Sequence, residues 1–295
     1  MVDQEYNSFG PWIYEVNDDY PMPPLFLPYY KEDMNYLMLV KIPRNIERRD
    51  AKPGMDMYDY VIGLYGDYIY ILKRAEKLVE EFKVFYKDVE CINNSIDLLL
   101  GSLSIKLRDN EIIIPYNTVS ENVIVHLIKI IRDRYTKMEY NIAVNTFIEE
   151  DIKVDDLYVN LLNRIKNMEQ RVKIGTVQSS VLVKLSQHAS LWQRVWGSLV
   201  GEKLLNTLHL LNDKELIVIT RGKQFKKFYE NILSYTFLYI PIEKLNSIKF
   251  ENYERYNNLQ KLKLELTNSS FEFYYEESNK EFIDFYNNIN NRISL

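Results

Sequence analysis

The feature that most limits the fold of this chain is an internal repeat. Residues 103–133 (LSIKLRDNEIIIPYNTVSENVIVHLIKIIRD) align without a gap with residues 262–292 (LKLELTNSSFEFYYEESNKEFIDFYNNINNR). Self-similarity of this kind indicates one supersecondary unit that is used twice. In the first copy Leu103, Ile105 and Leu107 alternate with polar residues, which is the pattern of a half-buried strand, and leucines fill the same positions in the second copy.

Each copy continues with a turn, a returning strand and a helix. Polar residues at 108–111 and 267–270 favour the turn, and Ser120 and Ser278 are candidate N-caps before an apolar pattern of helical period. The apolar helix positions are Val123, Leu127, Ile130 and Ile131 in the first copy, and Phe282, Tyr286 and Ile289 in the second. The sequence therefore predicts two β-hairpins, each followed by one amphipathic helix.

The repeat extends upstream in a weaker form. Residues 61–72 and 208–220 each indicate two strands around a short polar turn. The segments that follow, residues 77–89 and 223–233, show apolar spacing of three and four, and we predict that both are helical.

Proline is concentrated at the front of the chain, because all but two of the nine prolines precede residue 54. Proline fixes its own backbone and donates no amide hydrogen bond, so this region is predicted to be extended. Regular structure is expected to begin near residue 54.

The second copy, residues 208–295, resembles the bacterial pleckstrin-homology-like (PH-like) domains. The matching features are the strand pair LHLLNDKELIVIT, the IPIEKLNSI stretch at 240–248, the hairpin at Leu262 and a terminal helix from Lys280 to about Ile293. The resemblance implies an antiparallel β-barrel or sandwich that is closed by a C-terminal helix. Through the repeat it extends to about residues 58–136, although the first copy carries extra sequence before its hairpin, and the basic cluster that family members use for lipid headgroups has no clear counterpart.

These observations predict an α+β fold in four parts. An extended proline-containing segment occupies residues 1–57, the first PH-like domain 58–136, a helical spacer 137–202 and the second PH-like domain 203–295. Within the spacer, apolar residues recur at helical spacing from Val154 to Val172, and a second helix is expected at about 181–205.

Composition and spacing argue against several kinds of site. His126, His188 and His209 are isolated, and Cys91 is the single cysteine, so neither a zinc site nor a disulfide is expected. Cys91 also has no cationic neighbour that would make it nucleophilic. No phosphate-binding glycine motif occurs, so no cofactor is predicted.

A formal charge of −5 disfavours a nucleic-acid binder, which needs a basic face. Neither a secretory signal nor an apolar run long enough to cross a membrane is recognisable. The expected location is the cytoplasm, with the membrane periphery as the alternative.

Two groups of residues are candidates for binding. The basic cluster Arg221, Lys223, Lys226 and Lys227 follows the leading strand pair of the second copy, where lipid-binding relatives of the fold hold phosphorylated headgroups. The other group is Trp192 and Trp196, one helical turn apart, which could dock a partner or fill the core.

The leading functional hypothesis is a non-catalytic interaction or scaffold protein with tandem PH-like domains. Its partner would be a protein segment or an acidic surface, including that of a membrane. The alternative is an enzyme whose site is assembled between the two halves from residues distant in sequence.

Overall fold

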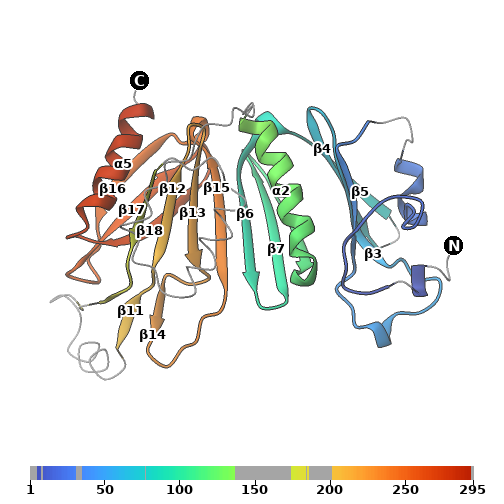
Figure 1. Ribbon diagram of the computed structural model, residues 1–295, viewed down its shortest axis with the longest axis horizontal. Helices are drawn as coiled ribbons and strands as arrows, with labels where there is room; N and C mark the ends of the chain where they lie inside the picture. The colour runs from blue at the N-terminus through green and yellow to red at the C-terminus, as the bar shows by residue number, and fades with distance from the viewer. Residues whose placement is uncertain are drawn as a thin grey trace. The chain divides into compact units, whose positions relative to one another are not determined.

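Antiparallel β-sheets form most of the described chain, and α-helices are few, which confirms the predicted α+β class. The computed structural model describes residues 5–7, 9–30, 35–76, 78–136, 174–183, 185 and 201–293 (Figure 1). The chain divides into two units, Met1–Met138 and Glu139–Leu295.

The first unit opens with a five-stranded antiparallel sheet whose strands follow one another in chain order. Its strands are β1 (Tyr14–Glu15), β2 (Met38–Pro43), β3 (Tyr58–Leu64), β4 (Tyr68–Ala75) and β5 (Leu78–Phe85). The N-terminal segment, with the 3-10 helix η1 (Pro24–Tyr29), packs Phe9, Met22 and Phe26 into one core with Leu39 and Tyr58.

Two predictions fail in this sheet. Regular structure begins well before residue 54, because Met38 to Ile42 are fully buried and pair with β3, and the nearby proline, Pro43, stands at the strand's end. Residues 78–85 form strand β5 and not a helix. Spacing of three and four over so short a segment does not exclude a strand, and here pairing with β4 determines the outcome.

Three further strands pair antiparallel in the first unit: β6 (Val89–Asp97), β7 (Leu100–Leu107) and β8 (Glu111–Asn117). The 3-10 helix η4 (Thr118–Ser120) leads into α2 (Glu121–Thr136). The hairpin and the helix lie where the repeat predicted them. Ser120 is buried, and its hydroxyl accepts a hydrogen bond from the Ile13 amide at 2.9 Å, which attaches the N-terminal segment to this end of the unit.

The second unit begins with four antiparallel strands in the order β15-β13-β12-β9. They are β9 (Ile174–Gln178), β12 (Thr207–Leu211), β13 (Glu215–Arg221) and β15 (Tyr235–Pro241). A three-stranded sheet follows, with β16 (Ser247–Asn252), β17 (Leu259–Glu265) and β18 (Ser270–Glu276), and then helix α5 (Lys280–Ile293). The helix contacts β9 and β16. Its buried residues are Phe282, Phe285, Tyr286 and Ile289.

A small extra sheet distinguishes the second unit. It consists of β10 (Val181–Leu182), β11 (Glu202–Leu204) and β14 (Phe225–Lys227). The predicted helices over 181–205 and 223–233 are therefore wrong where the structure describes these segments, because long-range pairing makes them strands. The helix predicted from Val154 to Val172 lies outside the described residues.

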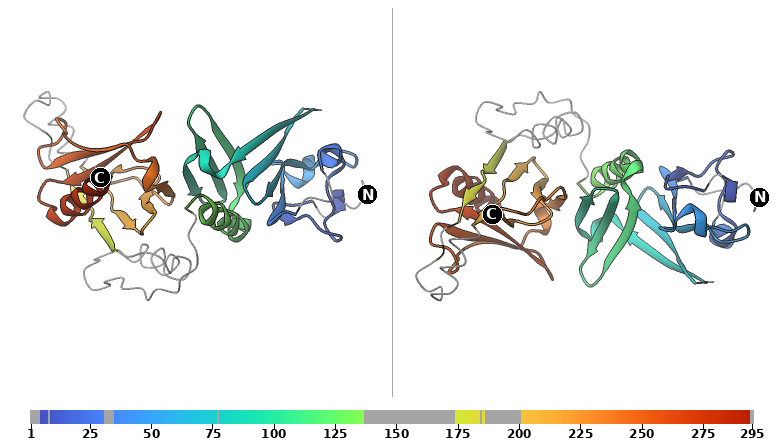
Figure 2. Two further views of the ribbon diagram at one scale, coloured as in Figure 1. Left: turned by 90° about the horizontal axis from the view of Figure 1, so that it is seen from above. Right: turned by 90° about the horizontal axis from the view of Figure 1, so that it is seen from below.

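The two units share one succession of elements. In each, a set of antiparallel strands, five in the first unit and four in the second, is followed by three more strands and by a helix, and Figure 2 shows α2 and α5 each beside the strands of its own unit. The registers also correspond. Leu100 pairs with Asn117 in the first unit, and Leu259 pairs with Glu276 in the second, so the offset of the sequence repeat holds in the strand pairing.

Candidate functional site

The predicted basic cluster lies at one end of the second unit, where β13 passes into β14. Arg221 ends β13, Lys223 lies in the turn, and Lys226 and Lys227 belong to β14. Three residues of the cluster contact one acidic residue, Glu230.

Glu230 is bound by the cluster in three ways. Its carboxylate lies 3.6 Å from Lys223 Nζ and accepts a hydrogen bond of 3.0 Å from the Lys227 amide, and its carbonyl accepts one of 3.0 Å from Lys226 Nζ. The Lys227 amide, followed by the Lys223 charge, holds the pKa of Glu230 below its usual value. The sequence interpretation omitted Glu230, although its position only three residues after Lys227 was a visible signal.

Exposed apolar side chains adjoin the cations. Phe228, Tyr229 and Leu233 are 56%, 70% and 58% exposed. The backbone of Phe228 is fixed, since its amide donates to the Gly201 carbonyl at 3.3 Å. Gly201 has φ of +53°, and a Cβ at that position would lie 2.0 Å from the Phe228 ring, so glycine is required there. We call residues 222–234 the basic-aromatic turn.

An aromatic cluster anchors β14 to the neighbouring β16–β17 hairpin. The Phe225 ring lies 4.8 Å from that of Tyr274 and 5.5 Å from that of Tyr256, and Tyr253 lies 4.5 Å from Tyr274. The hydroxyl of Tyr256 donates to the Glu202 carboxylate on β11. These contacts join three elements that are distant in sequence, and they hold the base of the basic-aromatic turn.

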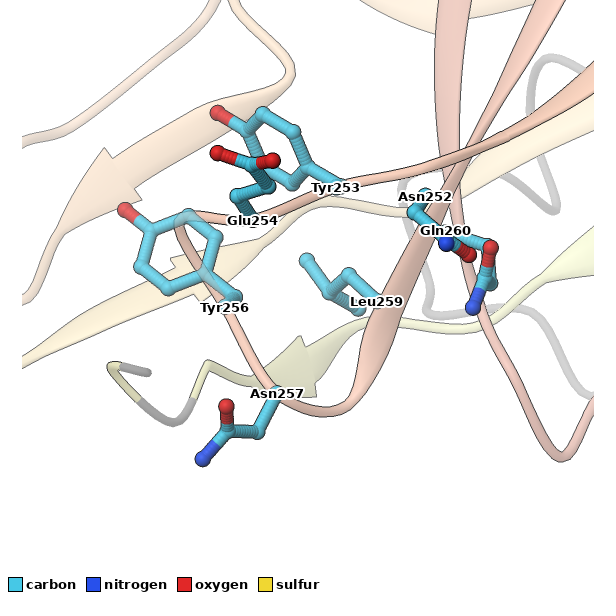
Figure 3. Close-up of a pocket in the computed structure, with 7 residues that line it drawn as sticks. All are labelled: Asn252, Tyr253, Glu254, Tyr256, Asn257, Leu259 and Gln260. Atoms are coloured by element: carbon cyan, nitrogen blue, oxygen red, sulfur yellow. The ribbon is translucent and has the colours of Figure 1, made fainter. Parts of the chain in front are cut away.

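An open pocket of about 460 Å³ adjoins this cluster, because Tyr253 and Tyr256 belong to its lining (Figure 3). Its lining residues are Asn252, Tyr253, Glu254, Tyr256, Asn257, Leu259 and Gln260. In Figure 3 the side chains of Asn252 and Gln260 lie side by side, whereas Asn257 points away from the other labelled residues. The lining offers stacking faces and hydrogen-bonding groups but contains neither a histidine nor a cysteine. Sequence reasoning missed this pocket.

The remaining candidate groups are buried or lie outside the described chain. Burial raises the pKa of the Cys91 thiol to about 12, so the reactive thiolate is strongly disfavoured. Burial likewise lowers the pKa of His209 to about 3, and this ring is fully enclosed. Trp192 and Trp196 lie outside the described residues, as does His188.

The described residues contain neither a cluster of metal ligands nor a helix suited to a bilayer. No group of three or more histidine, cysteine, aspartate or glutamate side chains in this part of the chain could hold a metal ion. Among the helices that the structure describes, none combines the length and apolarity that a bilayer crossing requires.

Comparison with known proteins gives weak likenesses. No protein-family model matches the sequence. The small ribosomal subunit protein uS4c of Stigeoclonium helveticum is 24% identical over an alignment of 253 residues, and the match covers 72% of this chain but 8% of that protein. A crystal structure of a DUF1696 family protein with a pleckstrin-homology domain, from Shewanella loihica PV-4, matches 40% of this chain and 99% of its own, with 15% identity and a TM-score of 0.21. Neither likeness assigns a family, so the function is argued from the chain's own residues.

Proposed function

We propose that this chain is a non-catalytic interaction protein with two PH-like units, and that its second unit attaches to acidic membrane surfaces. In both units a set of antiparallel strands, five in the first and four in the second, is followed by three more strands and a helix. This succession supports a PH-like assignment for both units, since that resemblance implies a sandwich closed by a C-terminal helix. The observation that carries the membrane proposal is the basic-aromatic turn, in which lysines adjoin exposed aromatic rings.

The chemistry of this turn matches that of a lipid–water interface. Aromatic rings favour the headgroup level of a bilayer, and cations nearby are attracted to anionic lipid. Phe228 and Tyr229 are exposed beside Lys226 and Lys227. Residues 221–234 carry four cations and one carboxylate, in a chain whose net charge is −5. Electrostatic attraction would therefore orient this end of the second unit toward the membrane.

The contacts of Glu230 bear on whether the cations bind a diffuse acidic surface or a single, tightly held headgroup. A built headgroup site needs cations that converge on an empty position, whereas Lys223 and Lys226 already contact Glu230. A charged membrane requires no such convergence, because it acts through the field of many lipids. The geometry therefore favours a surface over a stereospecific anion pocket.

Vesicle flotation tests the proposal. The protein should float with phosphatidylcholine vesicles that contain phosphatidylserine, and much less with phosphatidylcholine alone. Because each cation near an anionic surface contributes about 1 kcal/mol, reversing Lys223, Lys226 and Lys227 to glutamate should lower the partition coefficient by about a hundred-fold or more at low salt. The substitutions Phe228→Ser and Tyr229→Ser should weaken the binding that remains at high salt.

A matched control reverses three exposed cations elsewhere in the chain, Arg49, Lys52 and Lys280. It changes the net charge by the same amount and should leave flotation nearly unchanged. Equal losses in both triple variants would show that only the total charge matters, and that the basic-aromatic turn is not the attachment site.

The enzyme alternative stays an untested hypothesis. The described residues support it poorly, because the two nucleophile or base candidates, Cys91 and His209, are buried, and their pKa values are displaced away from neutrality in the unreactive direction. Membrane attachment would place the protein at the membrane periphery.

A further inference from the structure

The β6–β7 hairpin of the first unit ends in three consecutive exposed leucines. Leu98, Leu99 and Leu100 are 66%, 63% and 61% exposed, and Val119 beside them is 50% exposed. Hairpin turns are normally built from glycine, asparagine and aspartate, and a run of exposed apolar residues is unfavourable unless it has a function. We call Leu98, Leu99, Leu100 and Val119 the leucine tip.

The backbone of the turn makes the choice of leucine more unusual. Asp97 pairs with Leu100, so Leu98 and Leu99 form a two-residue connection, and Leu98 has φ of +53°. This left-handed conformation suits glycine or asparagine, whereas a bulky side chain is strained there. The sequence therefore keeps a leucine where the local structure favours a different residue, as expected if the side chain has a role outside the turn.

The leucine tip is held in a defined shape. Thr118 binds the turn twice, because its amide donates to the Leu99 carbonyl at 3.1 Å and its hydroxyl donates to the Leu98 carbonyl at 2.7 Å. The Asn117 side chain accepts a hydrogen bond of 3.1 Å from the Val119 amide. These bonds fix the tip before any partner arrives, which reduces the entropy cost of docking.

The second unit shows how the equivalent hairpin is covered. Leu259 corresponds to Leu100 in strand register, yet it is only 2% exposed, against 61% for Leu100. It forms one buried cluster with Leu204 of β11 and with Tyr256, and Val181 of β10 and Phe225 of β14 pack against this cluster from the extra sheet. The same chain thus buries one copy of this position under aliphatic and aromatic side chains, and leaves the other copy exposed.

The cover in the second unit also indicates the chemistry of a partner. Its aliphatic residues stand at alternate positions, Val181, Val183 and Leu185, as an extended strand requires. Near the leucine tip, residues 92–105 and 112–125 contain neither lysine nor arginine, and their only charges are those of Asp97 and Glu121. This acidic surrounding disfavours an anionic membrane and favours a segment that carries positive charge.

We propose that the leucine tip docks an extended segment of a partner protein, with aliphatic residues at alternate positions and a net positive charge. The mode would resemble the cover of the second unit, with aliphatic side chains over Leu99 and Leu100 and cations beside Asp97. This site is independent of the basic-aromatic turn. The leucine tip would bind the partner segment while the basic-aromatic turn attaches the protein to the membrane.

The test uses a labelled peptide with the sequence of residues 179–185, SSVLVKL, which combines the covering aliphatic positions with one lysine. Fluorescence anisotropy should show binding to the full chain. The double substitution Leu99→Ser/Leu100→Ser should weaken binding about tenfold or more, since it removes most of the apolar area. The matched control Leu37→Ser/Leu78→Ser removes two leucines that are 44% and 73% exposed elsewhere, and should bind the peptide as the parent does.

A further variant separates docking from folding. Leu98→Asn relieves the positive φ and should leave the first unit at least as stable, while peptide affinity falls. The lysine reversals of the basic-aromatic turn should not affect peptide binding, so the two proposals can fail separately.

Three results would overturn the docking proposal. The first is peptide binding that is absent, or equal in parent and Leu99→Ser/Leu100→Ser chains. The second is flotation with pure phosphatidylcholine vesicles that requires the leucines, which would make the tip a lipid anchor. The third is a leucine-dependent dimer in sedimentation velocity, which would make a second copy the occupant.

Discussion

Acidification should destabilise the second unit through one buried side chain, His209. The ring is fully enclosed, with Thr207 Oγ1 at 2.8 Å from Nε2 and Tyr286 Oη at 2.6 Å from Nδ1. Phe273 and Phe282 meet it edge to face at 5.3 Å and 4.9 Å between ring centres. No water can replace the solvation that an imidazolium would lose here, and burial lowers the pKa from 6.5 to about 3.

The direction and size of the effect follow from proton linkage. Between pH 6.5 and about 3 the unfolded chain binds a proton at His209 and the folded chain does not, so the free energy of unfolding falls as the pH falls through this window. The contribution is fully present above pH 6.5. From about pH 7.5 to about pH 5 the loss is about 2 kcal/mol, a large share of the stability of a typical domain.

The substitution His209→Gln tests this reasoning. It should cost about 2–3 kcal/mol near neutral pH, because it disturbs a packed, hydrogen-bonded site, but it removes the titrating group. The difference in unfolding free energy between the parent and the variant should therefore decrease by about 2 kcal/mol as the pH falls to about 5. The unfolding free energy of the second unit alone can be measured in urea titrations, if unfolding is followed by hydrogen exchange in peptides from β12 and β13.

If the unfolding free energies of the parent and of His209→Gln fell in parallel with pH, the proton linkage assigned to His209 would be wrong. A direct check is the NMR titration of the histidine ring protons, in which the resonance lost in His209→Gln should stay constant from about pH 8 to pH 5. A shift of that resonance with a midpoint near 6.5 would show that the folded ring is accessible to protons. His126, which is exposed on α2, provides a comparison signal.

Three further predictions concern local structure. Leu98→Asn should raise the unfolding free energy of the first unit by about 1 kcal/mol in urea titrations, because it relieves a left-handed φ; a loss would contradict this account. Gly201→Ala should destabilise the second unit by about 1–3 kcal/mol, whereas Gly66→Ala, whose Cβ meets nothing within 4 Å, should be close to neutral by the same measurement. Cys91 should react with a thiol reagent only after unfolding, since the side chain is 1% exposed and burial raises its pKa to about 12; rapid labelling of the native protein would disprove this.

The repeated hairpins and helices were predictable because each carries a strong local signal. Strand β18 covers Ser270–Glu276 and β8 covers Glu111–Asn117, both where the alternating apolar residues predicted a returning strand. Helix α5 begins at Lys280, close to the predicted N-cap. Its cap is Asn279, whose side chain accepts a hydrogen bond from the Phe282 amide at 3.1 Å, and not Ser278.

The elements that sequence reasoning missed depend on distant partners. Strands β10 and β14 have two and three residues, too few to show a period, and they are strands only because each pairs with β11. The leucine tip was missed for a related reason. Leu98 to Leu100 continue the apolar pattern of the flanking strands, and a turn at this point is visible only once Asp97 is known to pair with Leu100.

What separates the two units is more informative about function than what they share. The shared positions, such as Leu103 and Leu262, are fully buried and specify the fold. The differences lie at the hairpin where Leu100 and Leu259 correspond, because the second unit covers it with β10, β11 and β14, and the basic-aromatic turn includes β14. One unit thus carries a cationic, aromatic surface, and the other carries an apolar tip in acidic surroundings. Two surfaces of opposite charge and different polarity suit two different occupants, so the expected role is to join a protein segment to an acidic membrane.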